Sequence, residues 1–286
     1  MTIRRRSFIK NAALAALPLI PAVRVFAQET ARWPFFAFDN GVGRGKWPAE
    51  KQAATLKALG YDGISYNYTN NKDLENWIRV YRDAGLKIFG LYIRVSPANN
   101  PPWAPELRDA VTLLRGSQTV LWITVPAANA IAPAEYGDAV VKVFRDLGDL
   151  AHTAGLRVAI YPHNACYVAT AADSRGLADR VAHPDVGSSY NLCHEFLTGN
   201  GAAAMDSLRA FGPKASLVSI NGVDPADKKR FILPLGEGAF DMAAFLAELK
   251  RIGYKGPVGH QFYGVPGEPE MNLKAAIAAW RTLQPK

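Results

Sequence analysis

Short apolar runs alternate with longer amphipathic stretches along most of the chain. The runs are rich in β-branched and aromatic residues, as is typical of buried parallel strands. Eight of them predict strands at residues 35–38, 63–66, 87–93, 120–125, 157–161, 186–190, 216–220 and 258–261. The stretches between them place apolar residues three and four positions apart and predict helices at residues 48–59, 72–84, 105–115, 133–154, 171–181, 202–211, 240–252 and 273–283.

Glycine ends three of the predicted helices in the same way. Gly60, Gly85 and Gly253 each follow the last helical residues, where a left-handed cap is needed, and an apolar residue then returns to the core. Short turns from helix to strand favour a parallel sheet. Eight such units in 286 residues, without a break in composition, favour closure of the sheet. The pattern therefore predicts the α/β class and a single-domain (β/α)8 TIM barrel over residues 28–286.

The first 27 residues have a different composition from the rest. They hold five basic residues and no acidic one, so they account for five of the formal net charge of +8 and leave an ordinary +3. We therefore expect neither nucleic acid nor a membrane as a partner of the mature chain. Arg5-Arg6-Ser7-Phe8-Ile9-Lys10, followed by an apolar run too short to span a bilayer, resembles a twin-arginine signal. We expect a signal peptide at residues 1–27 and a periplasmic or secreted protein; a homo-oligomer stays open.

Polar side chains follow every predicted strand. In a barrel, the carboxyl ends of the strands point into one cup, so these residues should meet there. Polar groups in such a place lower the stability of the fold unless they form hydrogen bonds with one another, with water or with a ligand. A ring of them therefore indicates a small-molecule site. The residues proposed to bind substrate are Asp39, Asn67, Tyr92, Tyr161, Asn191, Asn221 and Tyr263. Because aromatic rings can stack on sugar faces, we expect a carbohydrate as the small-molecule partner.

Two histidines belong to this ring of strand ends. His163 and His194 each lie just beyond a strand, and we predict both to be catalytic, together with Glu195 and Glu237. A single loop histidine is usually a packing residue, but two at the same end of a barrel favour chemistry. Glu237 has an alternative role as a cap for the helix that starts near Asp241.

Two cysteines, Cys166 and Cys193, lie just past the fifth and sixth predicted strands. An oxidising compartment would allow a disulfide between them. We favour free thiols that line the mouth of the barrel.

The segment near the last βα unit resembles a known superfamily. Pro234-Leu235-Gly236-Glu237-Gly238, Asp241 and the run from Leu249 to Gly259 are similar to the closing unit of the xylose isomerase-like barrels, which include sugar epimerases and sugar phosphate isomerase/epimerase proteins. The resemblance covers most of the chain after residue 30. It implies a divalent metal held by Glu, Asp, His and Glu after the fifth to eighth strands. The metal would polarise a carbonyl group or an enediolate while carboxylates move a proton.

The chain departs from that ligand pattern at all four positions. They fall on Tyr161, Asn191, Ser219 and Gln261, none of which is charged. This makes a Mg²⁺ or Mn²⁺ site doubtful. A rearranged set of His163, His194 and Gln261, with or without Glu195, would suit one divalent transition metal, and metal binding stays open.

Two functions follow from this pattern. The first is an exported sugar isomerase/epimerase-like enzyme that acts on a sugar or keto-sugar by acid/base chemistry, with a lyase reaction as a variant. The alternative is a catalytically silent barrel that binds carbohydrate, which the loss of four ligand positions favours. The endonuclease branch of the superfamily is disfavoured, because it needs a metal cluster rich in carboxylates and histidines.

Overall fold

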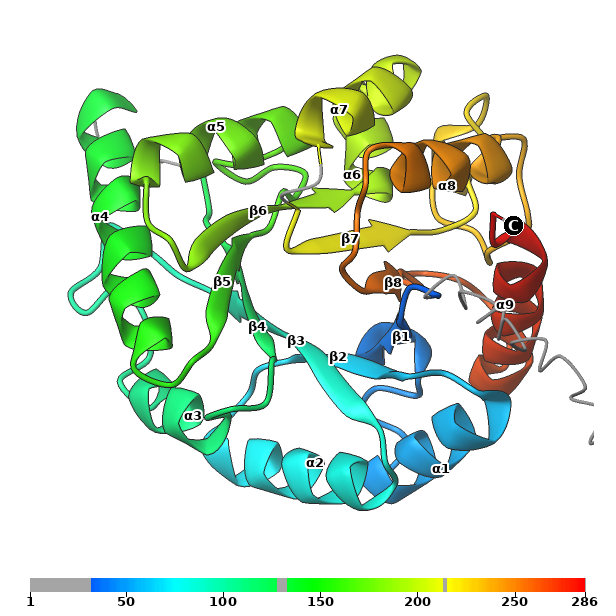
Figure 1. The fold of residues 1–286 in the computed structure, drawn as a ribbon, viewed down its shortest axis with the longest axis horizontal. Coiled ribbons are helices and arrows are strands. Elements are labelled where there is room, and N and C mark those ends of the chain that lie inside the picture. The colour runs from blue at the N-terminus through cyan, green and yellow to red at the C-terminus, as the bar shows by residue number, and fades with distance from the viewer. Residues whose placement is uncertain (1–31, 128–132, 213–214, 286) are drawn as a thin grey trace, which may run out of the picture. The chain divides into compact units, whose positions relative to one another are not determined.

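The computed structural model describes residues 32–127, 133–212 and 215–285. Eight parallel strands close into a barrel in the order of the sequence, and β8 pairs with β1 (Figure 1). This confirms the (β/α)8 barrel. The predicted signal peptide at residues 1–27 lies outside the described residues.

The strands begin and end within one residue of the predicted positions. Their bounds are β1 Phe35–Phe38, β2 Gly63–Asn67, β3 Lys87–Arg94, β4 Val120–Thr124, β5 Arg157–Ile160, β6 Val186–Asn191, β7 Leu217–Ile220 and β8 Val258–His260. Short apolar runs bounded by turn residues locate buried parallel strands well, because such strands are covered on both faces.

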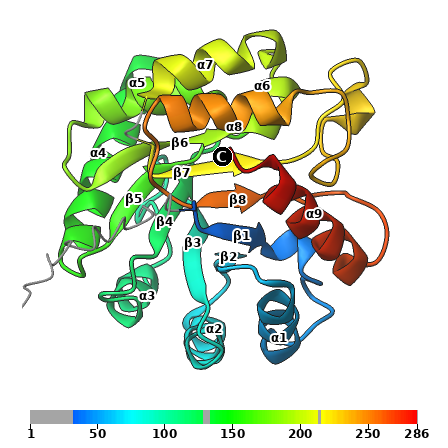
Figure 2. The ribbon, with the colours of Figure 1, turned by 45° about the vertical axis from the view of Figure 1, so that its right-hand side comes forward.

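The helices form a ring outside the strands (Figures 1 and 2). Their bounds are α1 Ala49–Leu59, α2 Asn71–Asp83, α3 Leu107–Leu113, α4 Pro133–His152, α5 Ala171–Val181, α6 Leu192–Leu197, α7 Ala204–Phe211, α8 Met242–Arg251 and α9 Pro269–Leu283. The short helix α6 was not predicted, and α9 starts four residues earlier than expected. In the described part of the chain, every helix is too short or too polar to cross a membrane.

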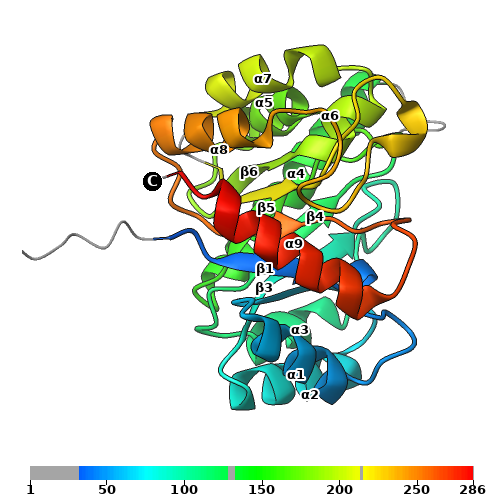
Figure 3. The ribbon, with the colours of Figure 1, turned by 90° about the vertical axis from the view of Figure 1, so that its right-hand side faces the viewer.

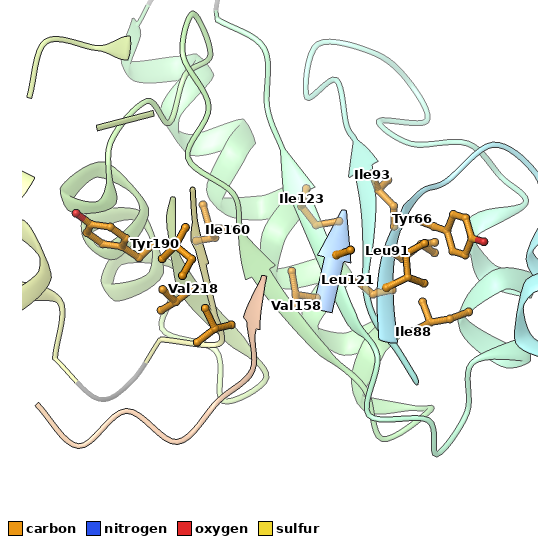
Figure 4. Close-up of a cluster of buried hydrophobic side chains, with 14 of the residues drawn as sticks. Tyr66, Ile88, Leu91, Ile93, Leu121, Ile123, Val158, Ile160, Tyr190 and Val218 are labelled. Atoms are coloured by element: carbon orange, nitrogen blue, oxygen red, sulfur yellow. The ribbon is translucent and has the colours of Figure 1, made fainter. Parts of the chain in front are cut away.

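Alternate residues of each strand pack in opposite directions. The outward residues form the large core between strands and helices; Figure 4 shows Leu91, Leu121 and Val158 from this layer. The inward residues fill the barrel with rings, and Phe36 is fully buried among them. Gly259 lies beside Phe36 across the β1–β8 pair, and a Cβ there would come within 2.5 Å of the Phe36 ring. Because Gly259 has no side chain, β8 leaves the space that the inner rings occupy.

Helix α9 closes the ring against β1 (Figure 3). Trp280 of α9 is fully buried and stacks on Phe35, with ring centroids 4.2 Å apart. His260 lies 6.1 Å from Phe35 and 3.9 Å from Phe262, measured between ring centroids. Strand alternation thus turns the His260 ring away from the barrel interior and toward the layer packed against the helices.

Candidate functional site

A cavity of about 470 Å³ opens at the carboxyl ends of the strands. This volume falls within the range of small-molecule sites. Phe38, Trp122 and Tyr161 give it an aromatic floor. The residues that line it are Phe38, Asp39, Asn40, Arg44, Ser65, Tyr66, Asn67, Tyr92, Trp122, Tyr161, His163, Asn164, His194, Leu197, Ile232, Gln261 and Tyr263.

A larger cavity, of about 730 Å³, lies at the amino ends of the strands, where residues such as Leu86, Thr119 and Pro257 line it. The described side chains around it include no histidine, cysteine, aspartate or glutamate. The cavity at the carboxyl ends has two histidines and an aspartate in its lining, so we place the site there, as in other barrels.

The two predicted histidines lie side by side on the cavity wall, with ring centroids 4.2 Å apart. The backbone of Asn164 binds both rings. Its carbonyl oxygen lies 2.7 Å from Nδ1 of His163 and can only accept, so that nitrogen carries a proton. Its N–H donates to Nδ1 of His194 at 3.2 Å, so the proton of neutral His194 is on Nε2. One backbone unit thus gives the two rings opposite tautomers: His163 presents an Nε2 lone pair, and His194 an N–H donor.

The surroundings of the two rings shift their pKa values in opposite directions. Burial, helped by the neighbouring charge of His163, lowers the pKa of His194 to about 3, so this ring is neutral at physiological pH. Burial alone would lower the pKa of His163 as well. Its hydrogen bonds to Cys166 and to the Asn164 carbonyl oppose that effect, and the pKa ends above its ordinary value.

Cys166 lies behind His163, with its Sγ 3.8 Å from Nδ1, and Thr124 donates to the same sulfur at 3.5 Å. Burial would raise the pKa of this thiol, but these hydrogen bonds outweigh burial and lower the pKa. Both cysteines are free, which confirms free thiols over a disulfide. Cys193 is fully buried beneath Asn191, so the expectation that it lines the mouth is wrong. Cys166 is partly exposed and lies directly behind His163 at this end of the barrel.

The four positions where the resemblance implies metal ligands carry neutral groups, and two of them, Asn191 and Tyr161, bind each other. Asn191 Nδ2 donates to the Tyr161 hydroxyl at 2.6 Å, and the Cys193 thiol donates to Asn191 Oδ1 at 3.1 Å. Gln261 Oε1 accepts three hydrogen bonds: from Asn40 Nδ2 at 2.5 Å, and from the backbone N–H groups of residues 262 and 263 at 3.0 and 3.1 Å. The Ser219 hydroxyl is buried without a partner among the described residues.

These residues do not fit a divalent metal. The four positions have no carboxylate to balance the charge, and the amide oxygens of Asn191 and Gln261 already accept hydrogen bonds. The rearranged set fails for the same reason at Gln261, and His194 is engaged at Nδ1 and protonated at Nε2. Within the described ranges, no three His, Cys, Asp or Glu side chains gather closely enough to hold a metal ion.

A charged pair stands on the opposite wall. Asp39 is 5% exposed, and its carboxylate accepts hydrogen bonds from the Arg44 guanidinium and, at 3.1 Å, from the backbone N–H of Asn67. Sequence reasoning missed Arg44. It lies between Gly43 and Gly45, which both have positive φ, and these turns fold the loop back over the mouth of the barrel. The glycine cluster was the signal, but its path could not be read from the sequence.

Several predicted site residues lie outside the cavity. Glu195 has no exposed surface; it accepts a hydrogen bond from the backbone N–H of Ala171, at the start of α5, and another from the Asn200 amide. Asn221 Nδ2 donates to the carbonyl groups of residues 222 and 231. Glu237 lines a separate small cavity beside Asp241. Asp241 itself caps α8, so the capping role considered for Glu237 is wrong.

Of the predicted residues, the structure brings eight to the walls of the one cavity: His163, His194, Asp39, Asn67, Tyr92, Tyr161, Gln261 and Tyr263. Asn191 lies directly behind Tyr161. Their roles remain predictions, but their convergence gives a pocket with one base, several donors and an aromatic floor.

Comparisons with known proteins agree with this fold. A family model described as xylose isomerase-like TIM barrel matches residues 53–283. Among solved structures, 3-keto-D-glucoside 4-epimerase, YcjR, from E. coli is similar with a TM-score of 0.71 and 16% identity, over 88% of this chain and 100% of that chain. D-allulose 3-epimerase from Methylomonas sp., in complex with D-allulose, gives 0.71 and 18% over 88% and 97%. The IOLI protein with a binding zinc atom gives 0.65 and 18% over 87% and 96%. No curated protein matches the chain. At these identities the likeness concerns the fold.

Proposed function

The chain belongs to the xylose isomerase-like TIM barrel family, and from this premise we propose that it is a sugar isomerase/epimerase-like enzyme that moves a proton beside a carbonyl group. The observation that carries the proposal is the histidine pair, whose opposite tautomers are fixed by Asn164 on the wall of the cavity. A base and a neutral donor in contact are the two groups that enolisation requires.

The cavity suits a carbohydrate. Its floor is aromatic and its walls carry amides, hydroxyls and the Asp39–Arg44 pair, which can bind ring faces and hydroxyl groups respectively. A structure of similar fold, D-allulose 3-epimerase, was determined with D-allulose bound, which supports the same class of ligand here.

In the proposed reaction, Nε2 of His163 takes a proton from the carbon beside the carbonyl group. The C–H electron pair forms a C=C bond, and the carbonyl π pair moves to oxygen. The imidazolium can return the proton to the same carbon. In an isomerisation it returns the proton to the neighbouring carbon instead, while the hydroxyl proton of the enediolate moves from its oxygen to the former carbonyl oxygen and the first carbon becomes the new carbonyl group. The Cys166 sulfur beside Nδ1 favours the charged ring, so the base stays basic despite its partial burial.

The experiment uses D-allulose, L-ribulose and a 3-keto-D-glucoside in D₂O, with NMR detection of deuterium at carbon. We expect wild type to exchange at least one carbon-bound hydrogen and His163→Asn to lose exchange by two orders of magnitude or more, on the scale of about 10²–10⁴ for acid/base groups. His152→Asn is the matched control, because that exposed ring pairs with Asp185 and lies outside the cavity. Binding of these sugars to wild type without any exchange would reject the enzyme and favour the silent binding barrel.

We also propose that residues 1–27 export the protein by the twin-arginine route. The basic, acid-free composition and the Arg5-Arg6 pair support this proposal. Replacing both arginines with lysine should retain the full-length precursor in the cytoplasmic fraction of a bacterial host. Unchanged export of that variant would refute the route.

A further inference from the structure

We propose that the Tyr161 hydroxyl donates a hydrogen bond to the substrate oxygen that becomes negative during enolisation, in place of the metal ion that the family resemblance implies. The inference rests on the proposed function, and it assigns the group that stabilises the intermediate. Its starting point is that the four positions where the family resemblance implies metal ligands carry neutral residues, which cannot balance the charge of a divalent metal ion.

The direction of the hydrogen bonds leaves the Tyr161 proton unused. The Cys193 thiol donates to Asn191 Oδ1, which places the NH₂ group of that amide toward Tyr161. Nδ2 of Asn191 then donates to the Tyr161 oxygen at 2.6 Å. The hydroxyl is therefore an acceptor within this chain of bonds, and its own proton has no acceptor among the described residues. Since Tyr161 lines the cavity, that proton is available to a ligand there.

Packing holds this donor in place. The Tyr161 ring is 3% exposed and meets Trp122 edge-on, with centroids 4.5 Å apart and planes at 78°. Tyr92 packs against it at 5.3 Å and 89°. A donor that is already oriented needs no rearrangement when negative charge develops, which is the main source of electrostatic catalysis. Burial raises the pKa of Tyr161 well above its ordinary value, so the hydroxyl keeps its proton at working pH.

His194 supplies a second donor beside the first. Its ring lies edge-on to Tyr161 with centroids 5.8 Å apart, and its Nε2 is buried with no partner in the described part of the chain. The tautomer fixed by Asn164 puts a proton on that nitrogen. Two neutral donors carry no net charge in the resting site, and in its low dielectric they stabilise a new negative charge strongly.

The chemistry balances without a further reactant. The proton leaves carbon for Nε2 of His163, the C–H pair becomes the C=C bond, and the π pair goes to oxygen. Tyr161 and His194 keep their protons and share them with that oxygen, and the return of the proton from His163 reverses each step.

The first test measures turnover of Tyr161→Phe with whichever sugar wild type converts. We expect kcat to fall by about 10²–10³, as when one oxyanion donor is removed, while KM stays within a few-fold. Tyr190→Phe is the control, because its hydroxyl binds the Ala204 carbonyl on the helix side of the barrel. If Tyr161→Phe keeps its kcat, the inference is overturned while the proposed function stands.

The second test needs no turnover. Calorimetry measures the affinity for two ligands: a four-carbon aldonohydroxamate, whose hydroxamate oxygens mimic the enediolate, and erythritol, which has only hydroxyl groups. After dialysis against EDTA, we expect Tyr161→Phe to lose roughly 10- to 100-fold in hydroxamate affinity, the range for one hydrogen bond to a charged group, and to bind erythritol as wild type does. Equal hydroxamate affinity of variant and wild type would overturn the inference. So would hydroxamate binding by wild type that EDTA abolishes and Zn²⁺ or Mn²⁺ restores, because a metal would then hold the oxygen.

Discussion

Replacement of Glu195 should destabilise the barrel. This carboxylate has no exposed surface and holds two elements together: it accepts a hydrogen bond at 2.7 Å from the backbone N–H of Ala171, in the first turn of α5, and another from the Asn200 amide after α6. A negative group at a helix start also interacts favourably with the helix dipole. Sequence reasoning proposed Glu195 as an acid/base residue, so the substitution separates a structural role from a catalytic one.

The magnitude follows from the two hydrogen bonds. A hydrogen bond to a charged group contributes about 1.5–3 kcal/mol, and an orphaned buried donor costs about 1–3 kcal/mol. Glu195→Ala leaves two such donors, so we expect a loss of roughly 3–5 kcal/mol in the free energy of unfolding. Glu195→Gln keeps one oxygen for the Ala171 N–H but turns an NH₂ toward Asn200, and should cost roughly 1–3 kcal/mol.

Urea unfolding followed by circular dichroism measures both losses. The m-value, which is the dependence of the free energy of unfolding on urea concentration, should be the same in variants and wild type. In parallel, deuterium exchange of the sugar by folded Glu195→Gln should stay within a few-fold of wild type. A Glu195→Gln variant as stable as wild type but inactive would refute the structural role and restore Glu195 as an acid/base residue.

Three further predictions concern other parts of the barrel. Iodoacetamide below pH 7 should alkylate Cys166 and leave the fully buried Cys193 unmodified, as measured by mass spectrometry. His163→Asn should slow the alkylation, because the lowered pKa of the Cys166 thiol depends on the His163 ring; equal rates in variant and wild type would contradict the Cys166–His163 hydrogen bond. Burial lowers the pKa of His260 from 6.5 to about 3. Between these two pH values His260 binds a proton in the unfolded chain but not in the folded one, so the free energy of unfolding should fall as the pH drops below 6.5. His260→Phe should flatten this slope by about 1.4 kcal/mol per pH unit in urea titrations at about pH 4 to 5.5, and an unchanged slope would reject the assignment. Gly259→Ala should cost roughly 1–3 kcal/mol or more in the same assay, since the new methyl overlaps the inner phenylalanine rings; neutral behaviour would mean that those rings have room to move.

The strands could be predicted from sequence because strands buried on both faces are short apolar runs, and the cup could be predicted because the carboxyl ends of all strands meet at one end of a barrel. That rule brought Tyr161, Asn191 and Gln261 to the strand ends. It could not show which hydrogen bonds they make, because each bond joins residues that are distant in the chain, as between Gln261 and Asn40.

The missed helix α6 explains why the sequence placed Glu195 in the cavity beside His194. It starts directly after β6 and has six residues, too few for a periodic pattern to be recognised. Successive residues of a helix are rotated by about 100°, so His194 faces the cavity while its neighbour Glu195 faces α5. A loop would have left both residues equally good candidates.

The most direct test of the account is a crystal structure of residues 28–286, with His163→Asn to prevent turnover, soaked in D-allulose or in whichever sugar wild type exchanges. The account predicts one sugar in the cavity at the carboxyl ends, its carbonyl oxygen within hydrogen-bond distance of the Tyr161 hydroxyl and the adjacent carbon facing residue 163. A sugar bound elsewhere, or one in this cavity whose carbonyl group points away from Tyr161 toward a bound metal, would contradict it.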